Sequence, residues 1–287
     1  MLKIMIRLML SMIYRLGKIP LLRETGALGL LNHLLELLYH LDSIKKNTYK
    51  LCKIQYEGIE FEMIGMRTDF DESIKLYGAY EPLLVDKLLK IVSTNDIVFD
   101  IGCAEGFFSI CASILNKNPR NIHAFDICAP RGRIFKKNFR RIFNMKKDYK
   151  QVCVSNVNAS NGVEELTINQ YVADNDLDVS KIKLIKIDVE GAEEKVLQGM
   201  DGSVLGTSDL LIEIHPGAIE RRFNGCADTI ADLIYGSGYK VELANIRGEH
   251  RGGIAFPWRT VQKEEFLAIY KDFVETDPPN FAIHAYK

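Results

Sequence analysis

The chain has 287 residues, of which 47% are hydrophobic, and its formal net charge is −1. This length and apolar content suit one large domain with an extension, and the balanced charge points to no particular class of partner. The six cysteines form no C-x-x-C pair, and no histidines have zinc-finger spacing. We therefore expect free thiols in the reducing cytoplasm rather than a disulfide framework.

The amino-terminal region, residues 1–50, is predicted to be a helical extension to a main domain that spans 51–287. Its apolar beginning is interrupted by Lys3, Arg7 and Arg15. No run there reaches the roughly 18 apolar residues of a transmembrane helix, and no small-residue cleavage site follows, so we expect no signal peptide. One interpretation is that these helices pack in the core or against a sister subunit. The other is that a basic amphipathic helix over 1–22 contacts an anionic membrane.

The main domain alternates short apolar segments with amphipathic ones. One or two short strands are expected over 54–64, and a helix is expected from Pro82 to Lys90. Strands are predicted at 96–101, 121–126, 150–155, 182–188, 208–214, 239–244 and 281–285. Helices are predicted at about 105–117, 131–143, 190–200 and 217–236, and a glycine-rich loop at 246–260. Such alternation predicts an α/β fold with a doubly wound, mostly parallel sheet, here of seven strands.

A loop with two glycines, Asp100 to Gly106, closes the first strand of this series. Glycines let a backbone turn tightly and approach a ligand, although a plain strand–helix turn would also contain them. Asp126 ends the next strand, where an acidic side chain can accept hydrogen bonds from both ribose hydroxyls of a nucleoside. Neither G-x-G-x-x-G nor a P-loop is present. The acidic Asp100 and Glu105 suit a ligand with an amino group better than one with a pyrophosphate.

Further polar residues follow the strands at 182–188 and 208–214. Asp188, Glu190, Glu213 and His215 are candidates for the general base that an alcohol acceptor requires, and an ordinary pKa of about 6.5 would suit His215. His215 could equally bond to a neighbouring loop, and Glu193 is expected to cap a helix or face solvent. Asp188, Glu213 and His215 could instead ligate a divalent metal, but we assign no metal from the sequence.

Five motifs occur in the order typical of one enzyme family. They are Tyr80-Glu81-Pro82, the Asp100–Gly106 loop, Ala124-Phe125-Asp126, the stretch Lys186–Glu193 and the stretch Leu211–Pro216. Across about residues 56–245 the chain resembles the FkbM-type S-adenosylmethionine-dependent methyltransferases. The resemblance implies a class I methyltransferase (Rossmann-like) fold, S-adenosylmethionine as cofactor, and methyl transfer to an oxygen. The expected cofactor-binding set is Glu81, Asp100, Gly102, Cys103, Ala104, Glu105, Gly106, Asp126, Ile127 and Asp188.

The sequence departs from the family pattern in three places. Cys103-Ala104 stands where Ala-Asn is usual, Asp126-Ile127 where Glu-Pro is usual, and Asn169 where an aspartate is common.

The implied acceptor is a saccharide, a glycolipid or another natural product, and the oligomeric state is left open. One alternative is an RNA methyltransferase, because nine basic residues lie between 131 and 150. Phe135, Phe139 and Phe143 share one face of that segment, however, and are expected to pack on the sheet rather than stack on bases. A non-catalytic binding module that retains the fold is the remaining alternative.

Overall fold

The computed structural model describes residues 50–65, 70, 74, 78–156, 159–160, 164–245, 256–274 and 280–287. Leu51–Lys287 forms one compact unit, which is the unit described below. The helices expected within residues 1–49 lie outside the described residues. All six cysteines are free, as expected. Within the described ranges, no helix combines the length and the apolarity needed to cross a membrane.

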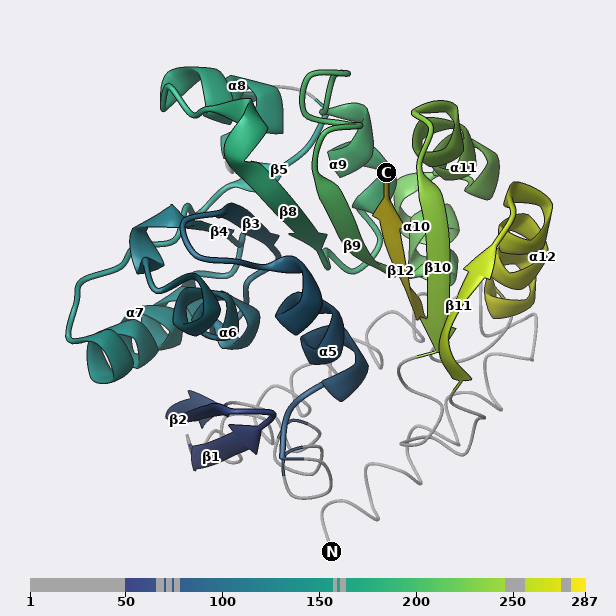
Figure 1. The fold of residues 1–287 in the computed structure, drawn as a ribbon. Coiled ribbons are helices and arrows are strands. Elements are labelled where there is room, and N and C mark those ends of the chain that lie inside the picture. The colour runs from purple at the N-terminus through teal and green to yellow at the C-terminus, as the bar shows by residue number, and fades with distance from the viewer. Residues whose placement is uncertain are drawn as a thin grey trace, which may run out of the picture. The chain divides into compact units, whose positions relative to one another are not determined.

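A seven-stranded sheet forms the centre of this unit (Figure 1). Its order is β11 (Phe256–Val261), β10 (Lys240–Asn245), β12 (Phe281–Tyr286), β9 (Asp209–Ile214), β8 (Ile182–Ile187), β3 (Ile97–Ile101) and β4 (Ile122–Phe125). Neighbours from β9 to β4 pair in parallel, and β12 runs antiparallel to both β9 and β10. The expected doubly wound, mostly parallel sheet is confirmed.

Two strands differ from the expected set. The segment expected as a strand at 150–155 meets the main sheet only through an isolated parallel bridge between Lys150 and Phe125 of β4. Its strand, β5 (Cys153–Val154), pairs with β7 (Glu164–Leu166) in a small separate sheet that also holds β6 (Ala159–Ser160). In its place the main sheet gains β11, whose residues were expected to be in a loop. The proline in β11 obscured this strand, but an edge strand tolerates proline because one side of it has no ladder to complete.

The helices cover both faces of the sheet (Figure 1). They are α5 (Pro82–Ile91), α6 (Phe107–Asn116), α7 (Ala129–Phe143), α8 (Ile168–Asp174), α9 (Glu193–Gln198), α10 (Pro216–Phe223), α11 (Ala227–Gly236) and α12 (Lys263–Val274). Helices α8 and α12 were not predicted. The helix expected over 217–236 is two helices, because Asn224 adopts a left-handed conformation with φ 53° and ends α10.

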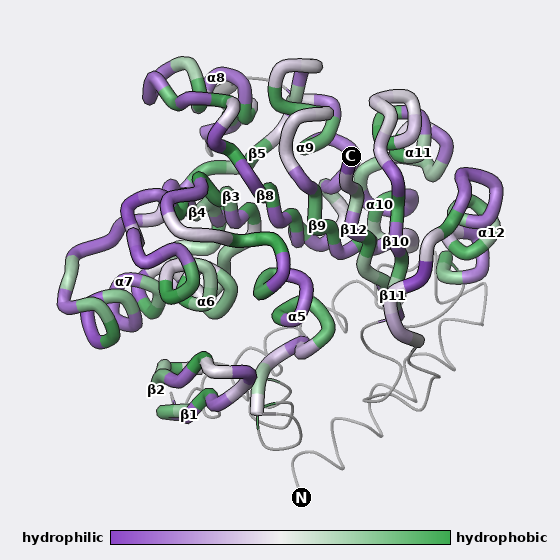
Figure 2. The backbone as a smooth tube through the Cα atoms, viewed as in Figure 1, coloured by the Kyte–Doolittle hydropathy of each residue, from purple (hydrophilic) through white to green (hydrophobic). Residues whose placement is uncertain are grey.

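Residues along each central strand alternate between two hydrophobic cores. In β3, Phe99 packs into the core shared with α8 to α12, whereas Val98 packs into the core shared with α5, α6, α7 and the β1 (Lys50–Tyr56) and β2 (Ile59–Gly65) hairpin. Figure 2 shows hydrophobic residues concentrated in the strands and hydrophilic residues along much of α7. Phe135 and Phe139 of α7 are fully buried, so they pack inward as expected. This arrangement leaves the carboxyl ends of the parallel strands as the edge where side chains can meet a ligand.

Candidate active site

The loop after β3 lies directly on the backbone that follows β8. Gly102 has φ 85°, and a Cβ added there would lie 1.8 Å from the carbonyl oxygen of Asp188. The Asp188 amide in turn donates to the carbonyl of Ile101 at 2.9 Å. The Gly102 and Cys103 amides donate to the carbonyl of Phe125, at 2.8 and 3.0 Å. Glycine is therefore required at position 102, because both the left-handed backbone and the close approach exclude a side chain.

Asp126, at the end of β4, holds the neighbouring loops with its side chain. Its Oδ2 accepts from the Ala104 amide at 2.8 Å, and its Oδ1 accepts from the Cys128 amide at 2.6 Å. A carboxylate oxygen can accept more than one hydrogen bond, so both oxygens retain capacity for ligand hydroxyls.

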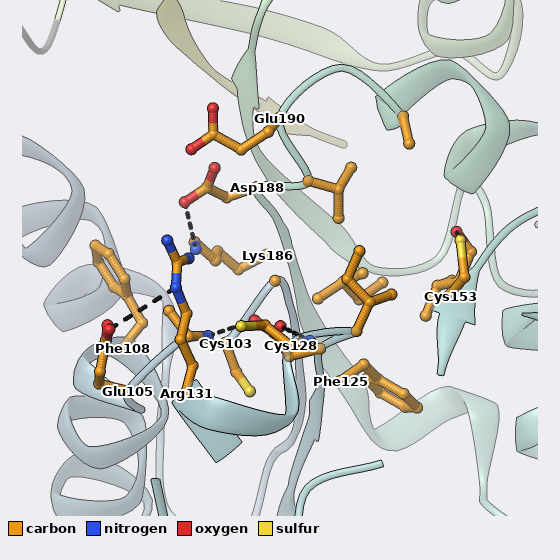
Figure 3. A pocket seen from close by; sticks show the side chains of 18 of the residues that line it. Cys103, Glu105, Phe108, Phe125, Cys128, Arg131, Cys153, Lys186, Asp188 and Glu190 are labelled. Atoms are coloured by element: carbon orange, nitrogen blue, oxygen red, sulfur yellow. Dashed lines mark hydrogen bonds and ion pairs between the residues drawn. The ribbon is translucent and has the colours of Figure 1, made fainter. Parts of the chain in front are cut away.

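A cavity of about 420 Å³ lies at this edge of the sheet, within the usual range of roughly 300–1,000 Å³ for small-molecule sites (Figure 3). Seven of the expected cofactor-binding residues line it: Gly102, Cys103, Ala104, Glu105, Asp126, Ile127 and Asp188. Glu190 also lines it. Glu81, Asp100 and Gly106, which were also expected to bind the cofactor, are not among the described residues that line the cavity. The cavity therefore joins the glycine loop to the acidic turn after β8.

Asp100 lies beneath the loop rather than in the cavity wall. Its Oδ2 accepts from the Ser109 hydroxyl at 2.6 Å, and its Oδ1 lies 3.7 Å from the Lys186 Nζ. Burial raises the pKa of this carboxyl above its ordinary value. Asp100 thus contacts Ser109 and Lys186, and its expected contact with an amino group of the ligand stays a prediction. Gly106 ends the loop in a left-handed conformation at the start of α6, and Glu81 is the buried residue that precedes α5.

Lys186 and Arg131 were not among the expected site residues, yet both line the cavity. The Lys186 Nζ lies 3.2 Å from the Asp188 Oδ2 and 4.8 Å from the centre of the Phe108 ring. Burial opposes the charge of Lys186, but the carboxylates of Asp188 and Asp100 outweigh it and raise the pKa. Figure 3 shows Lys186 beside Asp188, and Arg131 beside Glu105.

The sequence did contain a signal for Lys186, because a lysine within a buried apolar strand needs a partner. Asp188, two residues further on, lies on the same side of an extended chain.

The structure brings Asp188, Glu213 and His215 together behind the cavity, with donor atoms that all lie within 4.8 Å of one another. The His215 Nε2 lies 3.5 Å from the Glu213 Oε1, 4.0 Å from the Asp188 Oδ1 and 3.7 Å from the Glu190 Oε2. Asn280 donates to Glu213 through its side-chain amide. The ends of β8 and β9 and the turn after β8 therefore bring three carboxylates to a single imidazole.

Glu193 completes this group, which we call the His215 cluster: Asp188, Glu190, Glu193, Glu213 and His215. The Glu193 Oε1 lies 2.8 Å from the His215 Nδ1 and accepts from the Gly191 amide at 3.0 Å. The expectation that Glu193 caps a helix or faces solvent is wrong. Glu193 is the first residue of α9, which has no side-chain cap, and its side chain is fully buried. The helix begins at Glu193 rather than Glu190, because Glu190 and Gly191 both have positive φ and form a turn before it.

The surroundings of His215 change its acid–base behaviour. Burial by itself would lower the pKa of the imidazole, but hydrogen bonds to Glu193 and Glu213 outweigh it and raise the pKa to about 11. In these surroundings the ring holds its second proton at neutral pH. The ordinary pKa that would suit a general base is therefore not found, because the carboxylates around His215 favour the charged ring.

The sheet and the cavity define a class I methyltransferase fold: the antiparallel strand β12 lies between β9 and β10 in a doubly wound sheet, and a glycine loop and an acidic strand end face one cavity. Residues 116–241 match the family model of the methyltransferase FkbM domain. This part of the chain is an FkbM-type, S-adenosylmethionine-dependent methyltransferase domain, as the motifs indicated. The matched segment includes Asp126 and the whole His215 cluster.

No curated protein matches the sequence significantly. Among solved structures, precorrin-6y C5,15-methyltransferase from Geobacter metallireducens is similar at 17% identity and a TM-score of 0.44, covering 81% of this chain and 100% of that one. TYW2 of M. jannaschii, solved with AdoMet, has 11% identity and a TM-score of 0.39, with coverages of 83% and 86%. SMU.1697c of Streptococcus mutans, solved with SAH, has 13% identity and a TM-score of 0.37, with coverages of 71% and 95%.

Proposed function

We propose that the chain transfers a methyl group from S-adenosylmethionine to an oxygen of a saccharide, a glycolipid or another natural product. The observation that carries this proposal is that the glycine loop and the acidic turn after β8 line the same cavity. The ribose hydroxyls of the donor bind Asp126, and its methionine part lies along Gly102 to Glu105. The donor methyl then points toward Asp188 and Glu190.

Methyl transfer at this site is an in-line displacement. The acceptor oxygen bonds to the methyl carbon, the carbon–sulfur bond breaks, and S-adenosylhomocysteine leaves with the electron pair on sulfur. The protein's main contribution is to hold the two reactants in that alignment. The hydroxyl proton passes to a carboxylate on the acceptor side. Asp188 and Glu190 both line the cavity, and the Glu190 side chain, 60% exposed, can return the proton to solvent.

The basic segment gives less support to an RNA acceptor than its sequence suggests. Arg131 lies 3.8 Å from Glu105, Lys136 lies 2.6 Å from Asp148, and Arg141 lies 2.7 Å from Glu62. Paired cations attract phosphates less than unpaired ones do. A non-catalytic role gains no support either, because Asp126, Asp188 and Glu190 all line the cavity.

We also place the protein in the cytoplasm, in keeping with its six free thiols. The sequence of residues 1–22, outside the described residues, supports a peripheral membrane contact, which would bring the enzyme to a lipid-linked acceptor.

Transfer of a radiolabelled methyl group from S-adenosylmethionine tests the proposal, with separate pools of glycans, lipids and RNA as acceptors. We expect label in glycan or lipid, and loss of at least about 100-fold in Asp188→Asn with donor affinity retained. Asp178→Asn, which changes an exposed carboxylate that is not among the described residues lining the cavity, is the control. Label confined to RNA would overturn the acceptor assignment, and a fully active Asp188→Asn would remove Asp188 from the chemistry.

A further inference from the structure

The donor atoms of the His215 cluster are spaced as metal ligands are. Ligands about 2.1 Å from an octahedral ion are about 3 Å apart when adjacent and about 4.2 Å apart when opposite. The His215 Nε2 lies 3.5 Å from the Glu213 Oε1 and 4.0 Å from the Asp188 Oδ1, and all three donors lie within 4.8 Å of one another. Small side-chain movements would close these distances onto one ion.

Glu193 provides a second observation that is independent of this spacing. Its Oε1 faces the His215 Nδ1 at 2.8 Å and also accepts from the Gly191 amide, so Nδ1 is the nitrogen that carries a proton. The lone pair of a neutral ring then lies on Nε2, which faces Asp188 and Glu213. Metal-bound histidines nearly always donate their other ring N–H to a carboxylate or carbonyl in this way.

The charges of the group also call for a cation. Metal ligation requires that His215 lose the second proton it otherwise holds. The three less exposed carboxylates of the cluster, Asp188, Glu193 and Glu213, together with the Lys186 ammonium then carry a charge of −2. The side chains of Glu193 and Glu213 are fully buried, and that of Lys186 is 5% exposed, so solvent does little to screen this charge. A divalent cation would balance it.

A second buried histidine, His284, also lies beside two carboxylates, but there lysines balance the negative charge. His284 lies 3.6 Å from Asp209 and 3.1 Å from Glu242. There, Lys183 lies 3.4 Å from Asp209, and Lys87 pairs with Glu242, so each carboxylate has its own lysine. Each ring nitrogen of His284 faces one carboxylate, whereas the Nε2 of His215 faces several at once.

We propose that Asp188, Glu213 and His215 bind one divalent cation that accepts both carboxylate and imidazole ligands, such as Mn²⁺. Asp188 lines the cavity, so an ion bound to it would lie at the cavity edge, where it can hold and acidify the acceptor hydroxyl. This catalytic role, though not the binding, rests on the function proposed above. In this arrangement Asp188 binds the ion, and Glu190 takes the proton of the acceptor hydroxyl.

Binding of Mn²⁺ to the full chain, freed of metal by chelation, tests the site directly. We expect loss of the free Mn²⁺ signal in electron paramagnetic resonance, with one ion bound per chain. Asp188→Asn and Glu213→Gln should each weaken binding at least 100-fold, and Glu193→Gln, which keeps the side-chain shape, about 10- to 100-fold. Asp209→Asn, beside His284, is the matched control and should leave Mn²⁺ affinity unchanged.

Two further measurements keep the outcome decisive even where a buried variant fails to fold. Electron spin echo modulation of the wild-type complex should show coupling of the ion to an imidazole nitrogen, and its absence would overturn the site. Calorimetry with S-adenosylmethionine in chelator separates this proposal from the proposed function. Donor binding without Mn²⁺ binding would refute the metal site alone, and Mn²⁺ binding without donor binding would refute the methyltransferase function alone.

Discussion

Glu193 and His215 form a buried pair in which a carboxylate at the start of α9 holds an imidazole at the end of β9, 2.8 Å away. Glu193→Ala would leave the His215 Nδ1–H and the Gly191 amide without an acceptor. We expect a loss of about 3 kcal/mol in the free energy of unfolding. Urea denaturation provides the measurement. Glu220→Ala, on an exposed turn of α10, should cost less than about 0.5 kcal/mol, and equal losses in the two variants would contradict this account.

Gly102 should not tolerate any side chain. A Cβ there would lie 1.8 Å from the Asp188 carbonyl oxygen, and the backbone has φ 85°. Gly102→Ala should therefore lower the stability by about 2 kcal/mol or more and abolish donor binding, since the loop must move. Gly202 has nothing within 4 Å of an added Cβ and provides the control. Thermal melts and calorimetry of Gly102→Ala and Gly202→Ala test this, and indistinguishable results would show that the loop is more adaptable than we infer.

Asp126 is expected to bind the donor ribose. Asp126→Ala should weaken S-adenosylmethionine binding by roughly 1–3 kcal/mol, because the ribose hydroxyls would lose their acceptors. Stability should also fall, since the Ala104 and Cys128 amides lose theirs. Calorimetry measures the first effect and thermal melting the second. Asp148→Ala removes an exposed carboxylate that pairs with Lys136 and should change neither. An unchanged affinity in Asp126→Ala would remove this residue from the donor site.

His123 should make stability depend on pH. Burial, followed by the charge of Lys147, lowers the pKa of His123 to about 4, whereas an unfolded histidine titrates near 6.5. Between these values the unfolded chain binds more protons, so stability falls as pH decreases from about 6.5 toward 4 and is retained above that window. This difference between the folded and unfolded pKa values of His123 corresponds to about 3 kcal/mol at most in the free energy of unfolding.

His123→Gln, which can still bond to the Tyr171 hydroxyl without titrating, should reduce this pH dependence. Urea midpoints of both proteins at pH 7.5 and 5 provide the test. Identical slopes for wild type and variant would show that His123 does not contribute.

Residues 1–22 are predicted to contribute to membrane or partner association. On anionic lipid, both the apolar surface and the stripe of Lys3, Arg7, Arg15 and Lys18 should contribute, so binding should weaken as salt rises. Co-sedimentation with acidic liposomes compares the full chain with a chain that begins near Leu22. Equal sedimentation at low salt would exclude the membrane role. A lower melting temperature or an altered oligomeric state in the shortened chain would instead indicate packing within the protein.

The order of strands and helices in the main domain was predictable because it rests on local hydrophobic periodicity. Strand β8, for example, is a short apolar run followed by acidic residues. Such a run is typical of a strand buried within a parallel sheet, and the structure places β8 between β3 and β9. The placement of β11 and the separation of β5 were not predictable. Both depend on which strand completes an edge of the sheet, and that is decided by packing between distant segments.

The candidate site, too, was predictable from the sequence only in part. Gly102, Asp126 and Asp188 were identified because each lies at a strand end in a recognisable motif. Glu193 was misjudged because the first turn of a helix usually faces solvent, and only the position of β9 beside β8 reveals that this glutamate meets His215. The altered acid–base behaviour of His215 follows from the same contact, which no spacing in the sequence encodes.

The contact between the Gly102 backbone and the Asp188 carbonyl has a consequence for directed evolution. Main-chain atoms fix the floor of the cavity, so substitutions there break the fold before they reshape the site. Among the exposed residues of the lining, Ile127 is 60% exposed and can change, whereas Glu190, whose side chain is 60% exposed, is needed for the proposed proton transfer. Libraries that seek new acceptors should therefore vary exposed positions such as Ile127 and leave Glu190 and the Gly102–Asp188 contact unchanged.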